Sequence, residues 1–518
     1  MDSFTDLVTE QGLWATASVD DRPAGTDRAR ASSALGRSAT PADVLVGQTV
    51  RKAAGPVRSG GYLRDSITAE SFPQTAGTLD ARIRGASALV CFSHLRWNFV
   101  WQRPQHLLSR IARHLPVYVV EEPEFAEDDA PASVRMERRG DVTVITPLLP
   151  FDPEPRWGFN DTTNPHIRNL LAPVFSDLGL LGEESGTLVA WYYTPMAWGV
   201  APHAFRPALV VFDAMDELAN FRGAPRRLRE QEAALMAEAD LVFTGGPSLY
   251  EARKDRHPDV HCFPSGVEAS HFAQAANGVA RPADLAAVTR PVIGFYGVID
   301  ERVDLELLGA IAAARPDWTL AMIGPVLKIA KEDLPQHPNI LYFGKQEYRD
   351  LPGFLACFDV AILPFARNEA TQFISPTKTL EYMAGEKPIV STPIKDVVDL
   401  YGEVVAIAES PEEFVAAIER ALAEGPADRI RRLARARALL TLHDWDVIAA
   451  RMATLMGDAL ASRAPAFAMT APRTTSVVAA GFPPEPAFRS IRGILPLAGV
   501  RDDARALLDR SVTDAADD

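Results

Sequence analysis

The sequence predicts an α/β protein built from two doubly wound, Rossmann-like domains that face a central cleft. Short apolar runs alternate with helical stretches over residues 85–275, and the same alternation starts again over residues 276–440. This alternation is typical of parallel strands covered by helices on both faces. Because doubly wound sheets bind ligands at the carboxyl ends of their strands, we expect the ligands to lie in the cleft.

The apolar runs set the expected strands, and the helical spacing of apolar residues sets the expected helices. In the first domain strands are expected at residues 88–92, 117–120, 187–191, 208–212 and 241–244. In the second domain they are expected at residues 292–296, 319–323, 340–343, 360–363 and 389–391. The main predicted helices cover residues 105–115, 226–239, 304–314 and 376–384.

Five segments are expected along the chain. Residues 1–84 and 463–518 show no sustained hydrophobic period, so we expect a disordered N-terminal arm and a flexible C-terminal tail. The two domains occupy residues 85–275 and 276–440. Residues 441–462 are expected to form a helix that closes the ordered part.

Composition excludes several classes of protein. The 53 Lys and Arg residues against 68 Asp and Glu give a net charge of −15, which argues against a nucleic-acid partner because such a partner requires a basic face. The three cysteines stand alone among apolar residues, unlike a disulfide framework or a zinc site. No run approaches the ~18–20 apolar residues of a membrane span, and the start lacks the pattern of a signal peptide. The expected localisation is therefore cytoplasmic.

Residues with chemical functions are most concentrated in the segment that begins at Ser375, directly after two apolar residues. Ser375 is a suitable N-cap residue and Pro376 suits the first helical position, which makes Thr377 part of the first turn. This helix start is expected to face the crevice, where its free N–H groups form an anion site.

Two charged residues follow on one face of the same helix. Lys378 lies in the first turn, where a cation is unfavourable unless an anion sits beside it. Glu381 lies one turn further on, placed to accept hydrogen bonds from a pair of sugar hydroxyls. The alternative interpretation is a surface helix that carries an ordinary Lys–Glu pair.

With these residues in place, the stretch 364–392 resembles the donor-binding region of GT-B glycosyltransferases. The closest likeness is to the retaining, group 1 enzymes that build bacterial surface polysaccharides. Glu381, followed by Tyr382-Met383-Ala384-Gly385, matches the second of two family glutamates, which holds the nucleotide ribose. The first family glutamate falls on Phe373, so the group that contacts the transferred sugar is left open.

The resemblance also implies how the donor diphosphate is held. Arg302 stands near the position of a family lysine, and with Lys378 it would neutralise the departing diphosphate, so neither a metal ion nor another cofactor is expected. The donor-binding residues implied in this way, with the two helix-start residues, are Gly297, Gly324, Gly344, Ser375, Pro376, Thr377 and Glu381. The second domain is then the donor domain and the first the acceptor domain.

The acceptor side is expected in the loop after the first strand and at the end of a later strand. Aromatic residues of this loop can stack on sugar rings, although its tryptophans could equally pack over the core. The carboxylates near residue 213 could act as a base or simply cap the next helix. The expected acceptor-binding residues are Arg96, Trp97, Gln102, Arg103 and Asp216, and the expected catalytic residues are His94, Asp213, Arg302 and Lys378.

The resemblance implies transfer of a sugar from a nucleotide-sugar donor to a saccharide or lipid-linked acceptor during synthesis of cell-envelope or extracellular polysaccharide. A nucleotide-sugar epimerase of the same fold and an inactive nucleotide-sugar-binding partner remain alternatives. Arginines near residues 103–113 and 429–437 could make peripheral contact with an anionic membrane at the inner face of the cytoplasmic membrane. The favoured interpretation of these arginines is a solvated helix face.

Overall fold

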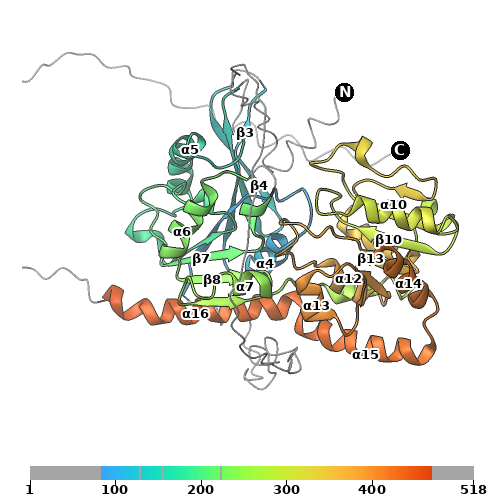
Figure 1. Ribbon diagram of the computed structural model, residues 1–518. Helices are drawn as coiled ribbons and strands as arrows, with labels where there is room; N and C mark the ends of the chain where they lie inside the picture. Colours follow the sequence, from blue (N-terminus) through green and yellow to red (C-terminus); the bar gives the residue numbers. More distant parts are fainter. Residues whose placement is uncertain (1–82, 84, 128–129, 153–156, 222–223, 469–518) are drawn as a thin grey trace, which may run out of the picture. The chain divides into compact units, whose positions relative to one another are not determined.

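The computed structural model describes residue 83 and residues 85–127, 130–152, 157–221 and 224–468 (Figure 1). Most of the predicted N-terminal arm and C-terminal tail lies outside the described residues. Residues up to Pro465 form one compact unit, and this unit contains two separate sheets. The predicted boundaries of the five segments stay a prediction.

Within the described residues, the first sheet has nine strands in the order β3-β5-β2-β1-β6-β7-β8-β9, with β4 paired to β5. Only the β4–β5 pair is antiparallel among these strands. The strands are β1 (Ala88–Ser93), β2 (Val117–Glu121), β3 (Glu124–Phe125), β4 (Ser133–Arg139), β5 (Val142–Leu149), β6 (Leu188–Tyr192), β7 (Leu209–Ala214), β8 (Leu241–Thr244) and β9 (Val260–Cys262). The helices with them are α4 (Arg103–Ile111), α5 (Thr163–Asp177), α6 (Leu228–Glu238), α7 (Pro247–Glu251) and the late helix α16 (Trp445–Ala468).

Alternate residues of β1 point into two different hydrophobic cores, as expected for a strand in the middle of a covered sheet. Leu89 and Cys91 belong to the core that includes α4 and α16, while Val90 and Phe92 belong to the core that includes α5 and α6. The register with β2 sets Leu89 opposite Val117. Helices thus cover both faces of the first sheet (Figure 1).

The second sheet has six strands within the described residues, in the order β12-β11-β10-β13-β14-β15, and all its pairs are parallel. Its strands are β10 (Val292–Tyr296), β11 (Thr319–Ile323), β12 (Ile340–Tyr342), β13 (Val360–Leu363), β14 (Ile389–Ser391) and β15 (Ala406–Ile407). The helices of this part are α8 (Ala269–Ala273), α9 (Ala283–Ala286), α10 (Leu305–Ala314), α11 (Leu351–Cys357), α12 (Lys378–Ala384), α13 (Lys395–Tyr401), α14 (Pro411–Leu422) and α15 (Pro426–Leu442). Short 3-10 turns η2 to η6 cover Glu183–Ser185, Pro195–Ala197, Leu218–Asn220, Lys331–Asp333 and Tyr348–Asp350.

The chain returns to the first sheet after completing the second. Trp445, Ile448 and Met452 of α16 are buried in the same core as α4 and β8. The helix runs on to Ala468, past the predicted end at residue 462. The closing helix therefore packs on the first sheet, although it follows the second sheet in the sequence.

Candidate active site between the two sheets

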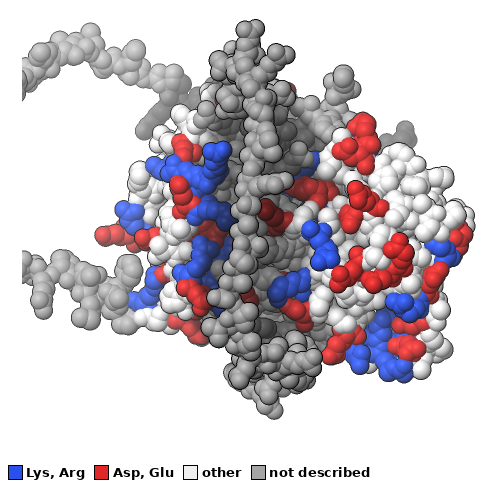
Figure 2. Space-filling view, in the orientation of Figure 1, with Lys and Arg blue, Asp and Glu red and all other residues white. Residues whose placement is uncertain are grey.

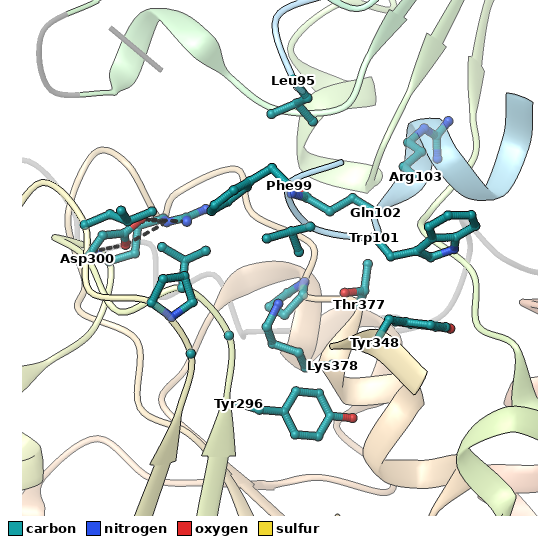
Figure 3. Close-up of a pocket in the computed structure, with 18 of the residues that line it drawn as sticks. Leu95, Phe99, Trp101, Gln102, Arg103, Tyr296, Asp300, Tyr348, Thr377 and Lys378 are labelled. Atoms are coloured by element: carbon teal, nitrogen blue, oxygen red, sulfur yellow. Dashed lines mark hydrogen bonds and ion pairs between the residues drawn. The ribbon is translucent and has the colours of Figure 1, made fainter. Parts of the chain in front are cut away.

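A cavity of about 460 Å³ lies where the carboxyl ends of strands from both sheets meet. Its first wall comes from the loop between β1 and α4 and from residues after β7. Its second wall comes from the loops after β10, β11 and β12 and from the start of α12. The predicted site residues among its lining are His94, Trp97, Gln102, Arg103, Asp216, Gly297, Arg302, Gly324, Ser375, Pro376, Thr377, Lys378 and Glu381. Figure 3 shows part of this arrangement, with Lys378 rising from α12 below the loop that carries Phe99 and Gln102.

Two glycines form the floor of the cavity at the ends of β10 and β11. Gly297 and Gly324 adopt φ angles of +150° and +143°, which side-chain-bearing residues rarely adopt. A Cβ on Gly324 would clash with the carbonyl oxygen of Gly297, and a Cβ on Gly297 would clash with the Cε of Lys378. The lysine side chain therefore lies directly on the glycine backbone. Gly344 is not part of the lining, but its carbonyl accepts the N–H of Gly324 at 2.8 Å.

The helix that carries Lys378 starts later than predicted. α12 begins at Lys378, preceded by Thr377, whose side chain makes no capping hydrogen bond. Pro376 lies in a tight turn before the helix, where its carbonyl accepts the N–H of Thr379 at 3.2 Å. The predicted N-cap role of Ser375 and the first-helical position of Pro376 are therefore wrong, while an anion site at the helix start stays a prediction. The positive charge at this point comes from the Lys378 side chain.

Burial shifts the pKa values of Lys378 and Glu381, the two charged residues of α12 that line the cavity. Burial lowers the pKa of Lys378, while Glu381 opposes this shift. Burial likewise raises the pKa of Glu381, and Lys378 opposes it. Each residue thus opposes the shift that burial causes in the pKa of the other, in a wall shared with the buried Tyr296 ring.

Arg302 is fixed by a carboxylate from its own loop. Its Nε donates to Asp300 Oδ1 at 2.9 Å and its Nη2 donates to Oδ2 at 2.7 Å. Burial alone would lower the pKa of Arg302, but the Asp300 carboxylate raises it. The guanidinium is therefore permanently charged and held in one orientation in the cavity.

His94 and Asp216 face the cavity from the first sheet. His94 is 3% exposed, its Nδ1 makes no hydrogen bond to any described residue, and burial together with Lys328 lowers its pKa to about 4. Burial raises the pKa of Asp216 to about 6, although Arg302 and Lys328 oppose this shift. The imidazole is neutral at pH 7, while the carboxyl can change its charge near that pH.

Two predicted site residues form a buried ion pair instead. Arg103 Nε and Nη2 donate to Asp213 Oδ1 at 3.1 and 2.9 Å, and Arg103 Nη1 donates to the carbonyl of Phe263 at 2.8 Å. Asp213 is fully buried and is not part of the cavity lining. In Figure 3 the Arg103 side chain points away from Lys378. The structure does not support the expected catalytic role of Asp213 or the expected acceptor-binding role of Arg103. The Arg103 guanidinium and the Asp213 carboxylate are each other's hydrogen-bond and ion-pair partner.

The loop after β1 presents different residues from those expected. Arg96 lies outside the lining, where its Nη1 donates to Glu121 Oε2 at 3.2 Å and to the Glu122 carbonyl at 2.6 Å. Trp97 is 7% exposed and packs in the core, whereas Trp101 is 39% exposed and lines the cavity. Gln102 lines the cavity, and its backbone N–H donates a hydrogen bond to Gln105 Oε1 at 3.0 Å. Trp101 is therefore the tryptophan available for stacking.

Some lining residues were not expected as site residues. Lys328 and Tyr348 follow β11 and β12, and Phe221 follows β7. Their signal in the sequence was only their position a few residues after a strand.

The arginines considered for membrane contact have protein partners. On α15, Arg432 pairs with Glu424 at 2.7 Å, while Arg429 and Arg437 both pair with Glu386. Figure 2 shows basic and acidic side chains together in this region. On α4, Arg110 contacts Glu268 at 3.2 Å and Asp446 at 2.6 Å. The α15 pairs favour an ordinary solvated helix face, whereas Arg110 of α4 is buried.

Among the described residues, the helices are all too short or too polar to cross a membrane. The same residues contain no cluster of three His, Cys, Asp or Glu side chains arranged for a metal ion.

The two sheets, with the cleft at the carboxyl ends of their parallel strands, have the architecture of the GT-B class, as the sequence predicted. Residues 290–424 match the family model described as Glycosyl transferases group 1, so this part of the chain is a domain of that kind. The match covers the second sheet and the residues around Lys378.

Comparison with individual proteins agrees with this class. The chain is 22% identical over 309 residues to the teichuronic acid biosynthesis glycosyltransferase TuaH of Bacillus subtilis (strain 168), covering 56% of this chain and 77% of that protein. It superposes on an α,α-trehalose-phosphate synthase from Burkholderia xenovorans in complex with glucose-6-phosphate, with a TM-score of 0.54 and 14% identity, covering 72% of this chain and all of the other. A sucrose-phosphate synthase from Thermosynechococcus elongatus gives a TM-score of 0.53 and 16% identity, with 73% and 100% coverage. These structural likenesses show the fold.

Proposed function

We propose that this glycosyltransferase moves a sugar from a nucleotide-sugar donor to a saccharide or lipid-linked acceptor in cell-envelope or extracellular polysaccharide synthesis. The observation that carries the proposal is the convergence of Lys378, Arg302 and Glu381 on one cavity, opposite His94 and Asp216. The family match over residues 290–424 and the likeness to TuaH support it.

In this proposal the second sheet binds the donor. Lys378 and Arg302 hold the diphosphate, and Glu381 accepts hydrogen bonds from the ribose hydroxyls. The absence of a side chain at Gly297 leaves room for Lys378 to lie on the backbone there, and the absence of one at Gly324 leaves room for the Gly297 carbonyl, so both glycines shape the floor of the proposed diphosphate site. Ser375, Pro376 and Thr377 line the same end of the cavity.

The transfer step breaks the bond between the anomeric carbon and a phosphate oxygen. A bond forms between that carbon and the acceptor oxygen, and the acceptor proton leaves with the nucleoside diphosphate. The two cations stabilise the negative charge that develops on the phosphate oxygen, a role that a metal ion has in other enzymes. We therefore propose a metal-independent reaction, in which a chelator such as EDTA leaves the rate unchanged. Retention of anomeric configuration is proposed from the family likeness.

A transfer assay with labelled UDP-, GDP- and ADP-sugars, with and without an acceptor extract, tests this function. The proposal requires a labelled product only when acceptor is present, and proton NMR of that product reports whether the configuration is retained. A sugar product without acceptor would instead indicate an epimerase. Donor binding without any product would indicate an inactive binding partner.

The pH dependence of transfer is expected to follow Asp216, if its carboxylate orients the acceptor hydroxyl. Because its pKa is raised to about 6, the group is mostly neutral below that pH and no longer offers the acceptor hydroxyl a negatively charged oxygen. We expect kcat/KM to rise about tenfold per pH unit up to about pH 6 and then level off. Asp216→Asn should be slow and lack this rise. A rise that persists in Asp216→Asn would assign it to another group.

The cytoplasm is the proposed location, because nucleotide sugars are the donors. The pairing of the α15 arginines gives no support for peripheral membrane contact through that helix.

A further inference from the structure

Lys328 is a positively charged residue of the cavity that has no role in the proposed donor contacts. It follows the end of β11 and lines the cavity. Among the described residues its Nζ makes no hydrogen bond, and the one carboxylate within 4 Å is Glu301, at 3.8 Å. Its backbone has a φ of +59°, a conformation that residues other than glycine rarely adopt. The fold thus holds a weakly paired lysine in a strained position at the cavity wall.

The side chain of Lys328 reaches toward the first sheet. Its Nζ lies 4.9 Å from the ring centroid of Phe221, which follows β7. Lys328 and His94 line the same cavity, and the charge of Lys328 helps to lower the histidine pKa. His94 is buried and hydrogen-bonds to the backbone of Tyr193, while its Nδ1 has no hydrogen-bond partner in the described part of the chain. A cation and an imidazole with one free nitrogen therefore line this cavity.

The position of Lys328 differs from that of the donor cations. In the second sheet β11 lies on one side of β10 and β13 lies on the other. Lys378 follows β13 and lies over Gly297, whereas Lys328 follows β11 and contacts Phe221 across the cleft. Arg302 already has a bidentate carboxylate partner in Asp300. A diphosphate bound by Lys378 and Arg302 therefore leaves Lys328 available to a second anion.

We propose that the acceptor is an acidic sugar, whose phosphate or carboxylate group binds Lys328 beside His94. This inference rests on the proposed glycosyltransferase function and specifies its acceptor class. The ammonium group supplies the charge, and neutral His94 accepts a hydrogen bond at Nδ1 from a neighbouring sugar hydroxyl, because its N–H is directed to the backbone of Tyr193. A neutral sugar would leave Lys328 with Glu301, at 3.8 Å, as the one described carboxylate within 4 Å.

Calorimetric titration of the full chain tests the proposal, with inorganic pyrophosphate added first to fill the donor site. Glucose 6-phosphate, glucuronate and glucose are then titrated separately. We expect at least one acidic sugar to bind and glucose not to bind measurably; the two acidic probes distinguish a phosphate site from a carboxylate site. Lys328→Gln should weaken the acidic sugar by roughly 10- to 100-fold, the range for a hydrogen bond to a charged group.

Three control variants make the result specific. Lys328→Arg should retain binding, because it keeps the charge. Lys331→Gln removes an exposed charge from the following turn, Lys331–Asp333, and should change nothing. Lys378→Gln should weaken pyrophosphate while leaving the acidic sugar bound. Thermal unfolding followed by circular dichroism shows whether each variant is folded.

The same titrations can overturn the proposal. Equal affinity for glucose and both acidic sugars, or full affinity in Lys328→Gln, would show that no anion site exists at Lys328. Loss of the acidic sugar in Lys378→Gln would show that it binds in the donor site. Failure of pyrophosphate to bind the wild-type chain would count against the donor site alone, because the response of the acidic sugar to Lys328→Gln is read independently.

Discussion

Replacement of Lys378 by glutamine is expected to lower kcat by about 10²- to 10³-fold, the loss seen when one group that stabilises developing negative charge is removed. The ammonium group lies in the cavity floor over Gly297, where burial strengthens its interaction with a departing phosphate. Steady-state transfer assays at saturating donor measure the effect.

A matched variant separates this effect from a general loss of positive charge. Lys395→Gln removes an exposed lysine of α13, which pairs with Asp399, and should leave kcat unchanged. Because Glu381 remains in Lys378→Gln, the affinity of this variant for the nucleoside should fall by a smaller factor than its kcat. Unchanged kcat in Lys378→Gln, with the variant folded, would remove this lysine from the mechanism.

The second large effect is expected on stability rather than on catalysis. Asp213→Ala should lower the free energy of unfolding by about 3–5 kcal/mol, because it leaves the buried Arg103 guanidinium without its counter-charge. The pair is 1% and 0% exposed, so water cannot replace the missing carboxylate. Urea unfolding followed by circular dichroism measures the change.

The double variant Arg103→Met/Asp213→Leu is the control for this prediction. It removes both charges together, and replacement of a buried ion pair by apolar residues is often neutral or stabilising. We expect it to regain most of the lost stability. A wild-type unfolding curve for Asp213→Ala would contradict the account of Asp213 as a structural residue and reopen its expected role as a catalytic base.

The parallel core of the fold could be predicted because buried strands have continuous apolar runs. The runs at residues 241–244 and 292–296 coincide with β8 and β10. β4 was not predicted, because Ser133–Arg139 is an antiparallel edge strand with mostly polar, partly exposed residues. The start of α12 was placed too early, because Pro376 suits the turn before a helix as well as its first residue.

The candidate site could be predicted where topology alone brings residues together. Arg302 and Lys378 lie at carboxyl ends of neighbouring strands, so their convergence follows from the sheet order. Arg103 and Asp213 could not be assigned in this way, since they are far apart in sequence and their pairing depends on packing between α4 and β7. Lys328 was missed because its surroundings, Phe221 and His94, come from the other half of the chain.

The central claim is that the cavity at Glu381 binds a nucleotide sugar. Calorimetric titration with UDP-, GDP- and ADP-sugars up to millimolar concentration tests it most directly, in the wild-type chain and in Glu381→Ala. Glu381 faces the cavity beside Lys378, so loss of its ribose hydrogen bonds should weaken donor binding by roughly 10- to 100-fold. The account predicts binding of one of the three donors by the wild type and this loss in the variant. Absence of binding for all three donors, or equal affinity in Glu381→Ala, would contradict it.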